Sequence, residues 1–475
     1  MTPTHDLDVS THSRINVPTS HVSTMENFPK RFWTRFQEEE FKESAALRTV
    51  VDGRVESLTF WKWTRRIQNL SMGLMEAGFE PGTRLGMIAS NGRDWLDVAM
   101  ATWLVGGCLV PLRPDHRREQ SLHCLGRSGC GWIAVDDIHE RDRLRGAGGA
   151  LPEHLQWVVF DGDDESDDVH PVDDLEEKGR NLVQRGHTSR LARRIYGIGR
   201  DDPALVLFEP DPGNDAEGAL FSGAKIEAQL GALARQMGLS GEDETVVSSA
   251  LNFGWFSSFL ISVATLYAGD CVGLPSSGES PTSAFDELRP TLLVCGPDFL
   301  EELAGDWEER LDAAPDILTR LASSDESDSP AIARALGGLG ERAARKLLYD
   351  PIRDQFGGRL QALQVFAGRC PVGLEPILEG ADIALLGHFG IPEAGVTHIE
   401  HPEAHRPDSC GRPIEGIATK IDGVKTGEVG ELCLRGELLF DDYWAGEGLR
   451  KIDEHGWLHT GIEARLESGF LFLAE

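Results

Sequence analysis

Two successive helix-and-strand units between residues 58 and 112 constrain the fold more than any other part of this sequence. An apolar stripe at helical spacing runs through Leu58–Gly78, and a short apolar run follows at Leu85–Ala89. The pattern then repeats, with a helical stretch at Asn91–Leu104 and an apolar run at Gly106–Leu112. Helices that alternate with short apolar strands are typical of parallel sheets covered by helices. The sequence therefore predicts an α/β fold with doubly wound sheets.

The length of the chain predicts more than one packed unit. A chain of 475 residues exceeds what one hydrophobic core usually accommodates. We expect a disordered lead at 1–24, α/β subdomains at 25–200 and 201–395, and a β-rich, barrel-like subdomain at 396–475. Two local predictions accompany this division: Met25–Ala46 is helical, and the acid-rich Asp161–Glu177 is a solvated linker.

The net charge of −32 limits the classes of partner. A polyanion such as nucleic acid would be repelled, and so would a surface of anionic lipid. The sequence therefore predicts no nucleic-acid partner. The charge fits a highly soluble or salt-adapted protein, or one with a basic partner.

No segment predicts export or membrane insertion. Met1–Ser23 is polar and has no apolar signal core. Thr245–Gly269 carries no charge, but its serines, threonines and Asn252 make a buried strand and helix a better interpretation than a transmembrane segment.

The eight cysteines form no Cys-x-x-Cys pair and no zinc-type spacing, as expected of free thiols in a reducing compartment. A cytoplasmic location follows as the expectation.

A second constraint is the apolar run Ala204–Phe208, which ends in an acidic turn and predicts a buried strand feeding a loop. Four of the nine residues from Glu209 to Glu217 are acidic, and Pro210 and Pro212 have no N–H to donate. A phosphate-binding loop needs inward backbone N–H groups and usually one cation. Two unit charges about 5 Å apart at an effective dielectric constant of about 20 interact by roughly 3 kcal/mol. The loop is therefore predicted to repel a triphosphate, although an acidic protein would also have acidic loops by chance.

Several motifs together resemble the AMP-dependent synthetase/ligase, or acyl-activating, family. The opening at Leu58–Leu112, the stretch Gly427–Gly436 and the stretch Gly456–Gly461 match the family's glycine-rich patterns in order. The helix at Lys346–Leu360 is similar to the long-chain fatty acyl branch. The resemblance covers about residues 45–475. It implies the large domain of such an enzyme, with ATP, magnesium and CoA as the expected cofactors.

The resemblance also implies a nucleotide site, which this sequence retains only in part. In the phosphate loop, Phe208 stands for the family's Tyr, Glu217 for its Lys and Gly218 for its Gly, with Gly213 between them. Farther along the chain, the resemblance implies that Phe389 and Gly390 stack on adenine and that Glu393 binds magnesium. It also implies that Thr460, Gly461 and Ile462 form the strand that binds the ribose. Ile462 occupies the position of the family's ribose-binding Asp and accepts no hydrogen bond. Phe389 as core and Glu393 as a solvated loop acid remain open alternatives.

The leading functional hypothesis is an acyl-CoA synthetase-like protein with lost or strongly impaired adenylation, acting as an acyl-binding or regulatory pseudoenzyme. Trp255, Phe256 and Phe259 are its candidate acyl pocket, with a fatty acyl chain as the expected ligand. The chain ends at Glu475, where the family continues into a small domain with a catalytic Lys, so that domain is expected to be absent. Two alternatives stay open. One is an active long-chain fatty acid ligase served by a detached lysine-bearing domain, and the other is a structural subunit of a paralogous synthetase.

Overall fold

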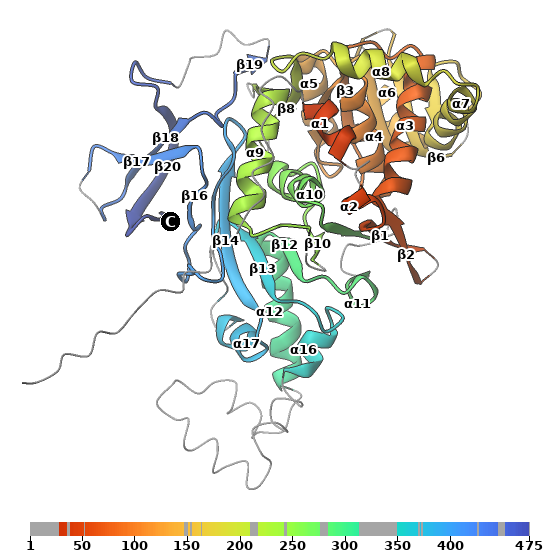
Figure 1. The fold of residues 1–475 in the computed structure, drawn as a ribbon. Coiled ribbons are helices and arrows are strands. Elements are labelled where there is room, and N and C mark those ends of the chain that lie inside the picture. Colours follow the sequence, from red (N-terminus) through yellow and green to blue (C-terminus); the bar gives the residue numbers. More distant parts are fainter. Residues whose placement is uncertain are drawn as a thin grey trace, which may run out of the picture.

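The computed structural model gives the arrangement of most of the chain (Figure 1). It describes residues 28–35, 39–51, 53–146, 151–152, 154–162, 164–209, 217–241, 245–275, 284–312, 349–368, 371, 374–424, 427–444 and 452–474. Gly213 lies outside the described residues, as do the lead at 1–24 and residues 346–348 of the helix expected at Lys346–Leu360. The described part of that segment contains α16 at Asp350–Asp354.

The first sheet has eight strands, and its inner strands are parallel. Its strands in spatial order are β19 (Asp442–Trp444), β9 (Gly218–Ser222), β8 (Pro203–Leu207), β4 (Cys108–Leu112), β3 (Arg84–Ile88), β5 (Trp132–Asp137), β6 (Gln156–Asp161) and β7 (Val169–Pro171). Its helices are α1 (Phe28–Arg35), α3 (Phe60–Glu76), α4 (Arg93–Leu104), α5 (Arg118–Ser128), α6 (Ile138–Arg145), α7 (Val172–Gln184) and α8 (Thr188–Gly197).

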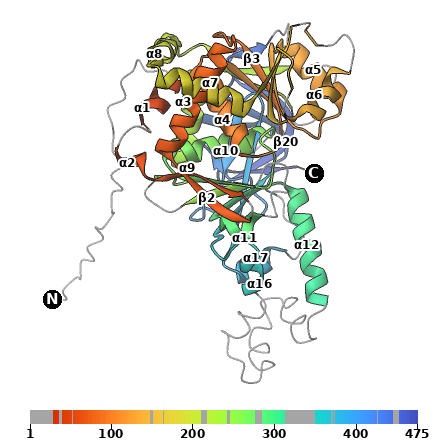
Figure 2. The same cartoon turned by 90° about the vertical axis from the view of Figure 1, so that its right-hand side faces the viewer.

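Alternate residues of these strands enter different cores. In β4, Leu109 belongs to the large core shared with α3 and α4, while Val110 and Leu112 belong to a second core shared with α5 and α6. This division follows from the two-residue period of a strand, which points neighbouring side chains to opposite faces. Figure 2 shows α3, α4 and α7 grouped apart from α5 and α6. The sheet is therefore covered on both faces, as a doubly wound fold requires.

The second sheet has nine strands. In spatial order they are β16 (Arg412–Pro413), β15 (Gly395–Ile399), β14 (Ala384–Ile391), β13 (Ala362–Phe366), β12 (Leu292–Cys295), β10 (Val246–Ser249), β11 (Cys271–Leu274), β1 (Ala45–Val51) and β2 (Arg54–Thr59). The accompanying helices are α2 (Glu39–Lys42), α9 (Gly223–Gln236), α10 (Phe256–Ala268), α11 (Phe285–Leu288), α12 (Pro297–Asp312), α16 (Asp350–Asp354) and α17 (Leu374–Gly380). In Figure 1, α9 and α10 lie on the side toward the first sheet, and α12, α16 and α17 lie on the far side.

A third, antiparallel sheet closes the fold. It has the order β17 (Ile417–Asp422), β18 (Gly430–Gly436), β20 (Leu458–Glu467) and β21 (Phe470–Leu473). It lies beside β14 and β16 in Figure 1, in the darkest blue. The predicted strands around Gly427–Gly436 and Gly456–Gly461 belong to it.

Two asparagines tie the two large sheets together at the ends of parallel strands. Asn91 follows β3; its Nδ2 donates to the carbonyl of Leu251 at 2.8 Å, and its Oδ1 accepts from the N–H of Phe253 at 2.7 Å. Asn252 follows β10, and its Nδ2 donates to the carbonyl of Ala89 at 3.0 Å. These bonds fix the carboxyl ends of β3 and β10 to each other, which is the edge where α/β folds place their sites.

The sheets do not follow the predicted ranges 25–200 and 201–395. Strands β1 and β2 pair into the second sheet, whereas β8 and β9, at 203–222, pair into the first. Likewise β15 and β16 extend the nine-stranded sheet beyond residue 395. Strand exchange of this kind depends on long-range pairing and leaves no local pattern in the sequence.

Two local predictions are wrong in part. The helical prediction for Met25–Ala46 holds for α1 and α2, but the segment ends in β1. The predicted linker Asp161–Glu177 contains β7 and the first turns of α7. Asp173 and Asp174 lie in the first turn of α7, where the positive end of the helix dipole favours carboxylates. Some of the acidic residues that suggested a solvated linker therefore lie at the start of a helix.

The uncharged segment Thr245–Gly269 forms β10 and α10, as predicted, and every residue of α10 is buried. No helix in the described part of the chain has both the length and the apolar character needed to cross a bilayer.

Candidate functional site

The turn between β8 and β9 holds the described ends of the predicted phosphate loop. Phe208 and Glu209 follow β8, and Glu217 precedes β9, which begins at Gly218. Phe208 is buried, and its ring lies against Gly218, where a Cβ atom would come within 3.0 Å of the ring and 2.4 Å of Val206. Only glycine fits this close approach, so Gly218 has a packing role here whatever its role toward a ligand.

Glu217 has a cationic neighbour that the sequence did not indicate. Nη2 of Arg127, in the last turn of α5, lies 3.5 Å from Oε1 of Glu217. Both side chains are partly exposed, at 38% and 24%. Arg127 therefore partly offsets the negative charge of Glu217 and turns one guanidinium toward the loop.

Glu393 lies in the turn between β14 and β15 and is held by a tyrosine from β19. The hydroxyl of Tyr443 donates to Oε1 of Glu393 at 2.8 Å, and the N–H of Phe440 donates to the Glu393 carbonyl at 2.8 Å. The carboxyl group is nearly buried, with Glu393 8% exposed. The interpretation of Glu393 as a freely solvated loop acid does not fit this burial.

Tyr443 connects Glu393 to the acidic loop. It pairs with Ala219 across the β19–β9 ladder, next to Gly218. Its pKa is raised well above the usual range, first by burial, then by Glu393, and further by Glu217 and Glu209. Glu393 thus bonds to this phenol, and Glu217 and Glu209 lie near enough to raise its pKa further, although Glu393 comes from a distant part of the sequence.

Phe389 and Gly390 lie in β14, packed into the protein. Phe389 is 4% exposed, and its ring stacks on Phe366 with centroids 6.2 Å apart and an interplanar angle of 26°. At Gly390 a Cβ atom would meet the carbonyl oxygen of Gly395 at 2.1 Å, so the residue allows β14 and β15 to approach closely. In this conformation one face of Phe389 is already occupied by Phe366. The neighbouring His388 is fully buried, and burial lowers its pKa to about 3, so it supplies no positive charge at neutral pH.

Thr460, Gly461 and Ile462 lie on β20, in a different sheet from β8, β9 and β14. Their polar groups already have partners: Thr460 Oγ1 donates to the Leu432 carbonyl at 2.8 Å, and the N–H of Gly461 donates to Oε1 of Glu431 at 2.9 Å. The N–H of Ile462 donates back to Thr460 Oγ1 at 3.2 Å. Because the Ile462 side chain accepts no hydrogen bond, the segment offers no carboxylate for a ribose at this position.

The candidate acyl residues divide between the core and its edge. Phe259 is fully buried between Trp95 and Trp103, with ring centroids 4.9 and 5.6 Å away, and Phe256 is 2% exposed. Trp255 is half-buried, and the Arg113 guanidinium lies over its ring at 4.7 Å. The three side chains therefore do not form one surface: Phe259 is a core residue, and Trp255 marks the edge.

Phe366, at the end of β13, joins the acyl and nucleotide candidates and was missed in the sequence. The centroid of its ring lies 5.8 Å from that of Trp255 and 6.3 Å from that of Phe256. The rings of His388 and Phe389 also pack against it, with centroids 5.5 and 6.2 Å away. An apolar residue at a strand end gave no distinctive signal. Arg127 and Tyr443 were also missed, because neither residue belongs to a recognisable sequence motif.

The described residues at this site, which do not include 210–216, are mostly acidic and do not favour the triphosphate of ATP. Glu209, Glu217 and Glu393 place carboxylates around the strand ends, and repulsion between charges a few ångströms apart amounts to kilocalories per mole where water is partly excluded. Arg127 is paired with one of these acids rather than left for a phosphate. A magnesium ion could bind Glu393, whose oxygen is a suitable hard ligand, but the phosphate groups that normally share that ion would face the other acids.

Comparison with known proteins places the fold in a family. The family model for AMP-binding enzymes matches residues 36–208 and 218–444. The chain is 23% identical over 434 residues to long-chain-fatty-acid–CoA ligase FadD15 of Mycobacterium bovis, covering 89% of this chain and 70% of that protein. It is 22% identical over 466 residues to long-chain-fatty-acid–CoA ligase ACSBG2 of Rattus norvegicus, covering 92% and 68%.

Solved structures support the same fold. A long-chain-fatty-acid–CoA ligase, FadD1, from Archaeoglobus fulgidus superimposes with a TM-score of 0.69 at 17% identity, covering 95% of this chain and 84% of that one. The predicted α/β fold with two doubly wound sheets and a smaller C-terminal antiparallel sheet is thereby confirmed, and so is the resemblance stated above. Because the family match spans well over half of its residues, this chain belongs to the AMP-binding enzyme family.

Proposed function

We propose that this chain is a long-chain acyl-CoA synthetase-like protein that has lost most or all adenylation and acts as an acyl-binding or regulatory protein. The observation that carries the proposal is that Tyr443, which lies beside the start of β9, bonds to Glu393 and has its pKa raised further by Glu217 and Glu209, where the family resemblance implies a triphosphate. A substrate with several negative charges would enter a field of the same sign.

The family comparison supports the same proposal from another direction. The match to the family model stops after residue 208 and resumes at 218. The unmatched residues 209–217 are the predicted phosphate loop itself, which carries Glu217 where the family has a lysine. The sequence thus departs from the family locally, while the strands on both sides, β8 and β9, keep their places in the first sheet.

Titration of the purified chain with magnesium-ATP in a calorimeter tests this function. We expect no binding in the micromolar range and no fatty acid-dependent exchange of pyrophosphate into ATP. A fluorescent long-chain fatty acid serves as the positive control, because its binding would show that the protein is folded and that the acyl part of the proposal holds. Micromolar ATP binding would contradict the loss of the nucleotide site.

An active fatty acid ligase is the second candidate, favoured by two observations. Glu393 keeps a carboxylate at the expected magnesium position, and Arg127 brings a cation within 3.5 Å of Glu217. In this case bound cations would neutralise the loop acids. Pyrophosphate exchange that depends on both magnesium and a fatty acid would support this candidate. If no exchange were detected with fatty acids of any chain length, even after a lysine-bearing domain was added, the result would count against it.

A further inference from the structure

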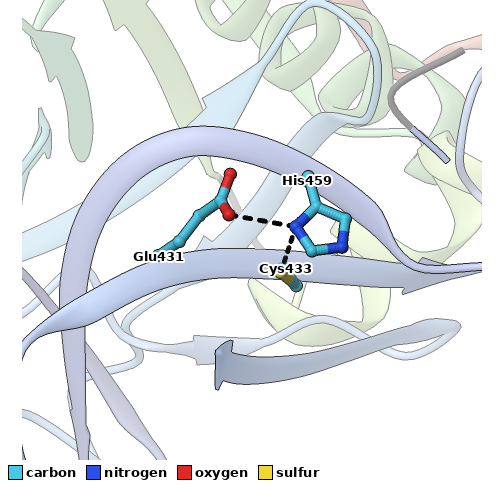
Figure 3. A group of neighbouring side chains, drawn as sticks. All are labelled: Glu431, Cys433 and His459. Carbon is cyan, nitrogen blue, oxygen red and sulfur yellow. Dashed lines mark hydrogen bonds and ion pairs between the residues drawn. The ribbon is translucent and has the colours of Figure 1, made fainter. Parts of the chain in front are cut away.

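Three side chains with different donor atoms converge on the antiparallel sheet, away from the acidic loop. Cys433 in β18 lies directly opposite His459 in β20. Glu431 precedes Cys433 by two residues and therefore points to the same face of the strand. Figure 3 shows the carboxylate, the thiol and the imidazole directed toward one another. Since cross-strand neighbours have Cβ atoms about 5 Å apart, the sheet itself sets this spacing.

The distances suit coordination of one small ion. Nδ1 of His459 lies 3.0 Å from Oε2 of Glu431 and 3.5 Å from Sγ of Cys433. All three donor atoms lie within 4.8 Å of one another. Tetrahedral ligands at about 2.0–2.3 Å from an ion are separated from one another by about 3.3–3.7 Å. The two distances from His459 are already close to this range, and the separation between the Glu431 and Cys433 donor atoms would have to shorten by at most about 1 Å.

A carboxylate next to the second ring nitrogen orients the imidazole of His459, as is usual for metal-binding histidines. Its other nitrogen, Nε2, lies 3.5 Å from Oδ2 of Asp453. Asp453 is itself fixed, because its Oδ1 accepts from the N–H groups of His455 and Trp457 at 2.8 and 2.9 Å. A carboxylate on the far nitrogen sets the ring orientation and leaves Nδ1 to face the ion.

Glu431 is positioned in the same way. Its Oε1 accepts from the N–H of Gly461 at 2.9 Å, which leaves Oε2 directed toward His459. The pairing register shifts between Glu431, opposite Glu463, and Cys433, opposite His459, so the extra residues of this bulge lie in β20 and not in β18. Bulged strands commonly re-aim side chains next to functional sites.

Charge and access both favour a cation. Asp422, Glu431 and Asp453 surround the cluster, and Lys420, which lies opposite Cys433 on β17, is bonded to Asp422 at 3.0 Å. Three carboxylates against one ammonium leave a negative site. The thiol is buried, whereas the His459 and Glu431 side chains are 33% and 38% exposed, so an ion can arrive from the solvent side.

We propose that Glu431, Cys433 and His459 form a binding site for a divalent cation of the zinc class, with Asp453 as the positioning residue. A nitrogen, a sulfur and a carboxylate oxygen are the donors that zinc and cobalt accept, whereas magnesium and calcium require oxygen ligands. Three protein ligands leave a fourth position for water or a ligand. The alternative is a metal-free network in which His459 carries a proton between the two carboxylates. The site does not depend on the proposed loss of adenylation.

Cobalt(II) distinguishes the two explanations because its spectrum reports sulfur ligation. The 475-residue chain is treated with a chelator, dialysed and titrated with Co²⁺, and Zn²⁺ binding is followed by competition. We expect one ion per chain, with a thiolate-to-cobalt charge-transfer band in the near ultraviolet and visible bands of tetrahedral intensity. Absence of the charge-transfer band in the wild-type protein would overturn the proposal.

Variants locate the site. Cys433→Ser should abolish the charge-transfer band and His459→Gln should weaken binding at least tenfold, whereas Cys124→Ser, which changes another buried thiol on α5, should leave the spectrum unchanged. Asp453→Asn should lower affinity about 10- to 100-fold while the position of the bands stays the same. A band that persists in Cys433→Ser would contradict the assignment. Circular dichroism of each variant confirms that a lost band does not reflect lost folding.

Discussion

The Tyr443 hydroxyl donates a 2.8 Å hydrogen bond to Glu393, a residue fifty positions earlier in the chain. This bond joins the edge strand of the first sheet to the β14–β15 turn of the second. It occupies one oxygen of the carboxylate that the family resemblance assigns to magnesium. Any ion at Glu393 would therefore have to share or displace the phenol.

We expect Tyr443→Phe to destabilise the protein by about 1–3 kcal/mol, because the nearly buried Glu393 loses a hydrogen-bond donor. The free energy of unfolding, measured with urea, provides the test. Tyr196→Phe is the matched control, because Tyr196 is 68% exposed and loses the same single oxygen. Equal effects of the two substitutions would contradict a structural role for the bond.

Glu217 should govern the affinity for a polyphosphate. In Glu217→Gln one repulsive charge is removed and Arg127 is released, and in Glu217→Lys an attraction is added as well. Each step is worth on the order of 1 kcal/mol at a partly exposed site. We therefore expect magnesium-ATP binding to tighten about fivefold in the first variant and about tenfold or more in the second, measured by calorimetry.

The control for this series is Glu301→Lys, which makes the same charge change at an exposed position on α12. If it tightened binding as much as Glu217→Lys, net charge rather than the loop would be responsible. Repeating Glu217→Gln together with Arg127→Gln should remove the part of the gain that comes from the released guanidinium and leave the part that comes from the removed repulsion.

The sequence predicted the helices and strands that depend on a local repeat of apolar residues. The stripe at Leu58–Gly78 became α3 and the run at Leu85–Ala89 became β3, because burial of an apolar face repeats along each element. What it missed depends on pairing over long distances. Arg127 meets Glu217 across 90 positions, and His459 meets Cys433 across 26. Cys433 and His459 lie within motifs that were interpreted as strand and turn, so their shared face became visible only with the register of β18 and β20.

The aromatic candidates for acyl binding should separate into a core residue and a ligand contact. Phe259→Ala should cost about 3–5 kcal/mol of stability, because a fully buried ring between two tryptophans is lost. Trp255→Ala should cost less, since the side chain is half-buried, but should weaken binding of a fluorescent long-chain fatty acid. If Trp255→Ala bound the probe as tightly as the wild type, the acyl pocket would not include this residue.

A final prediction concerns pH and the buried Glu400. Its side chain is 1% exposed and accepts hydrogen bonds from Nδ1 of His405 at 3.0 Å, the N–H of Arg406 at 2.8 Å and the N–H of Gly387 at 2.9 Å. The hydrogen bond to Glu400 is the main cause that raises the pKa of His405 above its ordinary value of 6.5, against the opposing effect of burial.

The sign of the resulting pH dependence follows from proton binding. Above pH 6.5 the folded state holds a proton on His405 that the unfolded state has begun to release, so this stabilisation is complete below that pH and is lost as pH rises through the higher folded-state pKa. Other histidines contribute with their own signs, because burial lowers the pKa of His398 to about 3. The quantity to measure is therefore the difference in unfolding free energy between the wild type and His405→Gln at pH 6 and at pH 8. We expect His405→Gln to be clearly less stable than the wild type at pH 6 and the gap to narrow at pH 8, whereas a gap that widens with pH would show that His405 is not held as a cation by Glu400.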